Sequence, residues 1–106
     1  MISLEEIQEI NRRFADGKII NNSIYYAIEQ KSLRDKISHI LRSLVIDHTF
    51  SDGNKRTAYI TTLLIFERSD IHIYKDTLTK MIIRIARENI IDIQEIIILV
   101  ERCIKK

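Results

Sequence analysis

Apolar residues recur at intervals of three or four positions along most of the chain, which is the spacing of one face of an α-helix. Ser3 precedes the first such stretch, and Glu6 three positions later completes a capping box, a pair that satisfies free backbone groups at a helix start. Ser32 and Asp92 precede two later stretches in the same way. These residues therefore predict the starts of three amphipathic helices.

The apolar positions of each stretch form a stripe that we expect to face a common core. They are Leu4, Ile7, Ile10 and Phe14; Leu33, Ile37, Ile40, Leu41, Leu44 and Val45; Leu78, Met81, Ile82 and Ile85; and Ile93, Ile96, Ile97, Val100 and Ile104. Residues 57–66 are instead apolar or small on nearly every side. That pattern predicts a helix surrounded by other helices.

Residues 19–28 depart from the helical period. Ile24, Tyr26 and Ile28 alternate with Tyr25 and Ala27, and the segment is rich in β-branched and aromatic residues. Because both features are typical of a strand, we predict a short strand or hairpin here. The whole pattern predicts a mainly α fold: one compact domain, residues 1–106, of about five to six helices with a small β-hairpin.

Composition narrows the classes of function. A hydrophobic content of 45% over 106 residues is enough for one domain with a real core. The 17 basic and 15 acidic residues are interspersed, so direct nucleic-acid binding, which needs clustered cations, is not expected. No apolar run has the length of a membrane span. Cys103 is the only cysteine, which excludes an intrachain disulfide and leads us to expect the reducing cytoplasm.

The polar segment 48–56 lies between two predicted helices and resembles a phosphate-binding loop in its residue types. Gly53, one of only two glycines, lets backbone N–H groups approach a ligand. The first N–H groups of the following helix lack partners and attract anions, and Lys55 and Arg56 add positive charge. We therefore predict phosphate binding by Gly53, Asn54, Lys55 and Arg56.

Three further residues of the segment suggest what the loop does with a phosphate. Asp52 would repel a phosphate unless a hard cation lies between them, and Mg²⁺ binds one or two carboxylates together with phosphate oxygens. His48 exchanges protons near neutral pH and suits a general base; it lies four residues beyond Leu44, so we expect it to continue that buried face. Phe50 is expected to point inward and anchor the loop. These roles predict phosphoryl or nucleotidyl transfer.

The run His48-x-Phe50-x-Asp52-Gly53-Asn54-Lys55-Arg56-Thr57 resembles the signature of the Fic/Doc superfamily, H-x-F-x-[D/E]-G-N-G-R-x-x-R. The order of the predicted elements along the chain is also similar to that family. Fic enzymes generally transfer AMP from ATP to a hydroxyl of a target protein. The resemblance implies the same helical fold and the same class of chemistry, with Mg²⁺ as cofactor and ATP as co-substrate.

Two positions depart from that signature. Lys55 replaces the second glycine, and Tyr59 stands where the last arginine would fall. Both departures resemble the Doc branch, the death-on-curing toxins, in which the nucleotide is thought to bind inverted so that its γ-phosphate is transferred. The resemblance therefore implies a kinase that modifies a threonine of elongation factor Tu and blocks translation. Transfer of AMP by a minimal Fic domain is the alternative.

The resemblance also implies roles for single residues and for partners. His48 would be the base and Asp52 the Mg²⁺ ligand, and the phosphates would lie on Gly53, Asn54, Lys55 and Arg56. In the family a β flap docks the target by strand addition, and here residues 19–28, above all Ile24, Tyr25, Tyr26 and Ala27, occupy the matching place. No inhibitory S/T-x-x-x-E-[G/N] sequence is present. Inhibition would then come from a separately encoded antitoxin with a tail that folds on binding. A non-catalytic module that acts only through its antitoxin is the second alternative.

Overall fold

The computed structural model describes residues 1–106 and contains six α-helices. They are α1 (Leu4–Arg12), α2 (Ser23–Ile28), α3 (Leu33–Val45), α4 (Asn54–Arg68), α5 (Lys75–Glu88) and α6 (Ile93–Arg102). The prediction of a mainly helical domain with about six helices is confirmed. None of these helices has both the length and the apolar character needed to cross a bilayer.

The predicted capping residues begin their helices. Ser3 forms the expected capping box: its hydroxyl accepts a hydrogen bond from the Glu6 N–H at 3.1 Å, and the Glu6 carboxylate accepts one from the Ser3 N–H at 3.0 Å. Ser32 accepts from the backbone of α3, and Asp92 accepts from the backbone of α6. Each cap satisfies a backbone donor that a helix start leaves unpaired, so the polar residue in the sequence fixes where each helix begins.

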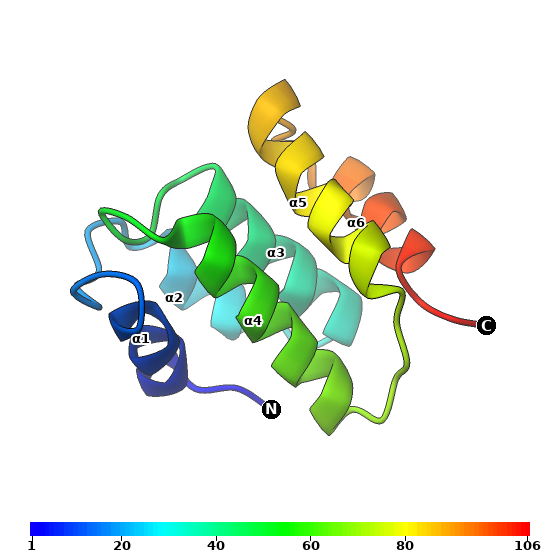
Figure 1. Cartoon of the computed structure of the whole chain (residues 1–106), viewed down its shortest axis with the longest axis horizontal. Helices are drawn as coiled ribbons and strands as arrows, with labels where there is room; N and C mark the ends of the chain where they lie inside the picture. Colours follow the sequence, from blue (N-terminus) through cyan, green and yellow to red (C-terminus); the bar gives the residue numbers. More distant parts are fainter.

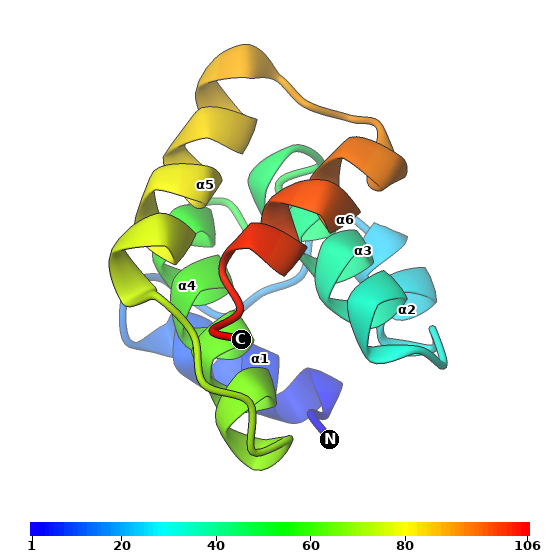
Figure 2. The ribbon, with the colours of Figure 1, turned by 90° about the vertical axis from the view of Figure 1, so that its right-hand side faces the viewer.

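Two helices organise the core. The longest, α4, passes between α1 and α5 (Figure 1) and also packs on α3. Helix α3 contacts α2, α4, α5 and α6, and Figure 2 shows α6 lying between α3 and α5. The prediction that residues 57–66 form a surrounded helix is therefore confirmed. Because α4 starts at the polar loop, its packing on three sides fixes the position of that loop.

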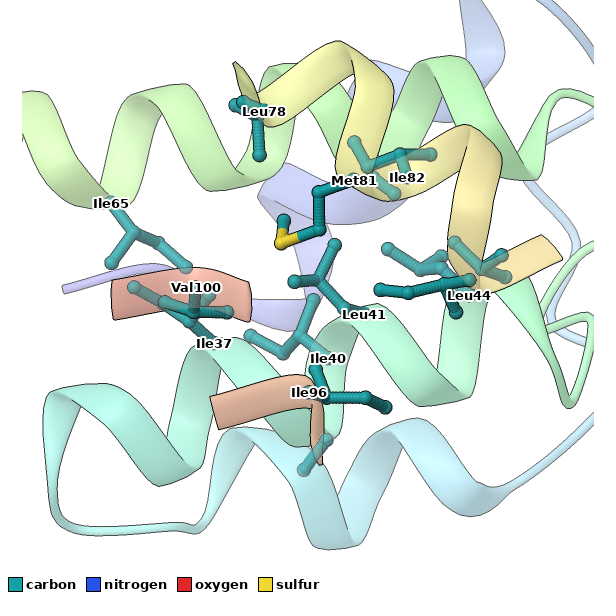
Figure 3. Close-up of a cluster of buried hydrophobic side chains, with 14 of the residues drawn as sticks. Ile37, Ile40, Leu41, Leu44, Ile65, Leu78, Met81, Ile82, Ile96 and Val100 are labelled. Atoms are coloured by element: carbon teal, nitrogen blue, oxygen red, sulfur yellow. The ribbon is translucent and has the colours of Figure 1, made fainter. Parts of the chain in front are cut away.

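The core itself is built from the predicted apolar stripes. Side chains of α3, α4, α5 and α6 meet in one cluster (Figure 3). The labelled members are Ile37, Ile40, Leu41, Leu44, Ile65, Leu78, Met81, Ile82, Ile96 and Val100. Burial of each such side chain contributes roughly 1.5–3 kcal/mol to the free energy of folding. This cluster therefore holds the helices that carry the polar loop in a fixed arrangement.

Helix α1 is tied to the far end of α4 by a surface ion pair. Nη1 of Arg68 donates to the Glu6 carboxylate at 3.0 Å and to the Met1 carbonyl at 2.7 Å. The hydrogen bond from Arg68, together with that from the Ser3 backbone, lowers the pKa of Glu6 to about 2. Both side chains are exposed, so the pair contributes little stability. Packing of α1 on α4 keeps the two helices together, and the C-terminal end of α1 lies at the polar loop.

The strand predicted around Ile24, Tyr25, Tyr26 and Ala27 is wrong, because these residues lie in helix α2. Ile24 and Ala27 are fully buried against the core, whereas Tyr25 and Tyr26 are exposed. Burial at positions three apart is helical, and packing on α3 outweighs the strand preference of the residue types. Extended backbone is limited to two isolated bridges, Ile19 with Phe50 and Ile73 with Ile104.

Candidate functional site

The loop between α3 and α4 is held by its own side chains. Phe50 is fully buried, so it anchors the middle of the loop as predicted. The Asn54 amide closes the loop: its Oδ1 accepts from the Phe50 N–H at 3.0 Å, and its Nδ2 donates to the Phe50 carbonyl at 2.8 Å. Each polar end of the Asn54 side chain therefore has a partner within the loop, and its backbone N–H has none.

A second set of bonds fixes the N-terminal half of the loop. The N–H and the hydroxyl of Thr49 both donate to the Ser43 carbonyl, at 3.2 and 2.9 Å. The Thr49 carbonyl accepts from the N–H of Ile20 at 2.8 Å, next to the bridge between Ile19 and Phe50. The extended backbone beside the loop is therefore the segment 19–21, which is the start of the predicted flap region 19–28 and precedes Ile24–Ala27.

Asn11 is a central residue of the site that the sequence did not single out. It is fully buried at the C-terminal end of α1. Its Nδ2 donates to the Asp52 carbonyl at 2.9 Å and to the Thr57 hydroxyl at 3.1 Å, and its Oδ1 accepts from the Gly17 N–H at 2.9 Å. One amide thus joins α1, the turn after it, the loop and α4. The only sequence feature that marks Asn11 is its position four residues after Ile7, which places a polar side chain on the buried face of α1.

The loop ends in a helix start with free donors. Gly53 has φ 73°, a left-handed conformation that glycine adopts without strain, and no side chain caps α4. A Cβ at this position would lie 3.0 Å from Cβ of Phe14. The backbone N–H groups of Asn54, Lys55 and Arg56 have no acceptor within the chain. The N-terminus of α4 therefore presents three donors, which suits an anion.

His48 lies at the edge of this arrangement rather than in the core. Helix α3 ends at Val45, and His48 has φ 54° and an exposed side chain. The expectation that it continues the buried face of Leu44 is wrong, because the helical spacing stops three residues before it. The change of backbone direction turns the imidazole toward solvent on the same side as the start of α4.

These residues surround one polar cavity of about 640 Å³. His48, Asp52 and the first turn of α4 line it, and Lys55 and Arg56 are exposed at its edge. Arg56 is steadied by Phe14, whose ring centroid lies 5.6 Å from its Cζ. Proton acceptor, carboxylate, backbone donors and two cations therefore share a space of the size that small-molecule sites occupy.

The predicted metal ligand is a single carboxylate. No three side chains of the kinds that hold a metal come together in the chain. Oδ1 of Asp52 accepts from the Gly53 N–H at 2.8 Å, and its side chain is exposed beside the free N–H groups. One carboxylate suits Mg²⁺ that arrives with phosphate oxygens and keeps its own waters. The residues present therefore fit a nucleotide-bound Mg²⁺ and do not form a separate protein metal site.

The structure brings together most of the predicted site residues. The residues that line the polar cavity include His48, Asp52, Gly53, Asn54, Lys55 and Arg56, whereas Phe50 is fully buried and does not line it. Residues 24–27 do not line it. Tyr26 instead lies edge-on against His39 of α3, with ring centroids 5.2 Å apart.

Comparison with known proteins gives one match. No curated protein and no solved structure matches the chain. A family model described as the Fic/DOC family matches residues 4–66, which is more than half of the chain. The matched region runs from the start of α1 through the polar loop to nearly the end of α4, so it contains every residue that lines the polar cavity except Ala86 of α5. The chain belongs to the Fic/DOC family.

Proposed function

We propose that this protein is a Doc-like toxin kinase that transfers the γ-phosphate of ATP to a hydroxyl of a target protein. Members of the Fic/DOC family commonly transfer nucleotide or phosphate groups. The observation that carries the choice within the family is the pair Lys55 and Tyr59, which replace the second glycine and the last arginine of the Fic signature. Both replacements change the phosphate-binding part of the signature, and both resemble the Doc branch, in which the γ-phosphate is transferred.

The proposed reaction uses His48 as general base. Its imidazole accepts the proton of the target hydroxyl while the hydroxyl oxygen forms a bond to the γ-phosphorus. The bond between that phosphorus and the oxygen bridging to the β-phosphate breaks, and ADP leaves. A base placed in this way contributes about 10²–10⁴-fold to the rate. The exposure of His48 on the rim of the cavity supports this role, because a protein substrate must reach it from outside.

The other residues act on the phosphates. The free N–H groups at the start of α4, with Lys55 and Arg56, hold the negative charge in place. Asp52 and the nucleotide would hold Mg²⁺, which would neutralise charge on the phosphate oxygens. Gly53 keeps the backbone close enough for these contacts, since any side chain there would meet Phe14.

Target docking is proposed for the segment 19–21 in place of residues 24–27. It is the extended backbone beside the loop, and Ile20 is 59% exposed there. An extended target segment can add its backbone to such an edge, which brings a neighbouring hydroxyl close to His48. The target expected from the family resemblance is a threonine of elongation factor Tu, and the inhibitor is a separately encoded antitoxin.

Mass spectrometry of the target after incubation with the protein, Mg²⁺ and ATP tests the proposal. We expect elongation factor Tu to gain the mass of one phosphate, and to gain none with His48→Ala. His72→Ala is the matched control, because His72 is also exposed but lines a different cavity. A gain of one AMP would overturn the kinase assignment in favour of adenylyl transfer. An unchanged mass would contradict elongation factor Tu as the target.

A further inference from the structure

Both glycines of the chain lie against the same end of α1. Gly17 and Gly53 have φ of 71° and 73°, a conformation that glycine adopts more readily than other residues. A Cβ at Gly17 would lie 2.5 Å from Cγ of Arg12, and a Cβ at Gly53 would lie 3.3 Å from Nδ2 of Asn11. The C-terminal end of α1 therefore packs closely against two turns: the one that follows α1 and the one that ends the polar loop.

Asn11 is the side chain that bonds to the backbone of both turns. Its Oδ1 accepts from the Gly17 N–H at 2.9 Å, and its Nδ2 donates to the Asp52 carbonyl at 2.9 Å and to the Thr57 hydroxyl. The amide is fully buried. Rotation of the amide by half a turn would set its donors against the Gly17 N–H and its oxygen against the Asp52 carbonyl. The Asn11 side chain therefore has one stable orientation.

The bond from Asn11 fixes the direction of the peptide group between Asp52 and Gly53. The carbonyl and the N–H of a trans peptide point in opposite directions, so the Gly53 N–H is directed away from Asn11. It donates to Oδ1 of Asp52 at 2.8 Å, and this carboxylate is exposed at the polar cavity. A reversed peptide would turn a carbonyl oxygen toward the cavity, where it would repel an anion at the start of α4.

We propose that Asn11 is a positioning residue for the transfer reaction, because its amide keeps the peptide between Asp52 and Gly53 from reversing. This inference rests on the proposed function, since the peptide matters to the reaction only if a phosphate lies at the start of α4. Gly53 does not supply the constraint itself, because glycine is permissive about its backbone conformation. Asn11 does not line the polar cavity, so it acts through the loop backbone.

Gln8 provides a matched comparison on the same helix. Its Nε2 donates to the Gly17 carbonyl at 3.1 Å, so it holds the turn after α1 and has no bond to the polar loop. Gln8→Leu therefore loses a contact to one turn, whereas Asn11→Leu loses contacts to both. Val100 is a second comparison, because it lies in the core on α6 and does not line the polar cavity. Val100→Ala lowers stability without changing the loop.

Nuclear magnetic resonance of the protein with isotopically labelled glycine tests the peptide orientation without any ligand. The chain has only two glycines, so the spectrum holds one amide signal from each turn. We expect Asn11→Leu to shift or broaden both signals, and Gln8→Leu to shift only the signal of Gly17. A Gly53 signal that Asn11→Leu leaves unchanged would overturn the proposal.

Isothermal titration with Mg²⁺·ATP measures the consequence for the site. We expect Asn11→Leu to weaken binding about tenfold or more, because the peptide is no longer kept from placing a carbonyl oxygen beside the phosphates. Gln8→Leu and Val100→Ala should each change the affinity less than about twofold. Undiminished affinity in Asn11→Leu, or an equal loss in Val100→Ala, would overturn the positioning role.

These measurements fail separately from the proposed function. If Asn11→Leu weakens Mg²⁺·ATP binding as expected while the natural chain adds no phosphate to the target, the role of Asn11 stands and the kinase reaction fails. If Asn11→Leu transfers phosphate with the same kcat/KM as the natural chain, the kinase reaction stands and the role of Asn11 fails.

Discussion

The Asn54 side chain holds both polar backbone atoms of Phe50, accepting from its N–H at 3.0 Å and donating to its carbonyl at 2.8 Å. Asn54 is the first residue of α4, and Phe50 is fully buried. The backbone of the loop would otherwise leave two buried polar groups unpaired, which costs more than the hydrogen bonds themselves contribute. The asparagine of the signature is therefore a structural residue of the loop as well as one that lines the polar cavity.

Asn54→Ala should destabilise the protein by about 1–3 kcal/mol, because it leaves the N–H and carbonyl of Phe50 without partners. Urea unfolding followed by circular dichroism measures the change in the free energy of unfolding. Asn22→Ala is the control, since Asn22 precedes α2 and makes no side-chain capping bond. If Asn54→Ala lowers the free energy of unfolding as little as the control does, water replaces the amide as the partner of Phe50. The hydrogen bonds of Asn54 would then contribute no net stability.

The fold was predictable wherever a local signal and the tertiary packing agree. Ser3 and Ser32 cap their helices through neighbours three residues away, so the sequence alone places them. Residues 24–28 are of types that favour a strand, and five residues are too few for the helical and strand periods to be separated. Burial of Ile24 and Ala27 against α3 decides for the helix, and that packing is not visible in a local pattern.

The distinction between local sequence signals and tertiary contacts also applies to the candidate site. Residues 48–56 are contiguous, so their chemistry could be predicted from their types and spacing. Asn11 could not be found in this way, because its partners Asp52 and Thr57 lie 41 and 46 residues away. The outward position of His48 also escaped prediction, since it depends on a left-handed backbone conformation at a residue other than glycine.

The bond between Asn11 and Thr57 should appear as a coupling energy. Asn11→Ala, Thr57→Val and the double variant form a mutant cycle, and we expect a coupling of roughly 0.5–3 kcal/mol from urea unfolding. Thr57→Val keeps the shape of the side chain and removes the hydroxyl that accepts from Asn11. A cycle of Asn11→Ala with Thr79→Val is the control, because Thr79 bonds only within α5. Strictly additive losses in the first cycle would contradict the contact.

His39 should make folding stability depend on pH. Burial, with the nearby Arg42 charge, lowers the pKa of His39 below its ordinary 6.5, although Asp35 acts against this. As the pH falls below about 6.5, His39 binds a proton in the unfolded chain before it does so in the folded chain. The free energy of unfolding therefore decreases from about pH 6.5 down to the lower pKa of the folded state. Melting temperatures measured at pH 8 and pH 5 should differ less for His39→Gln than for the natural chain.

His72→Gln is the control at an exposed position, and it should show the same decrease in melting temperature as the natural chain. An equal decrease in all three proteins would exclude His39 as its cause.

His48 should be more important for catalysis than for stability. Its φ of 54° costs an L-residue about 1–2 kcal/mol, a strain that glycine does not have. We therefore expect His48→Gly to be more stable than His48→Ala by about 1 kcal/mol, offset in part by the greater freedom of glycine when unfolded. Both variants should lose about 10²–10⁴-fold in transfer rate, because both lack the imidazole proposed as the general base.

Substitutions at Asn89 separate the effect of backbone strain on stability from the effect of the lost imidazole on the transfer rate. It ends α5 with φ 51°, so Asn89→Gly and Asn89→Ala should differ in stability in the same direction as the His48 pair. It does not line the polar cavity, so neither variant should slow transfer. Melting temperatures and phosphate transfer rates of the four variants provide the comparison. If His48→Gly is both more stable than His48→Ala and inactive, the backbone strain at His48 is kept for the position of its imidazole. If His48→Gly retains full activity, the base must be another group, and the strain has no catalytic purpose.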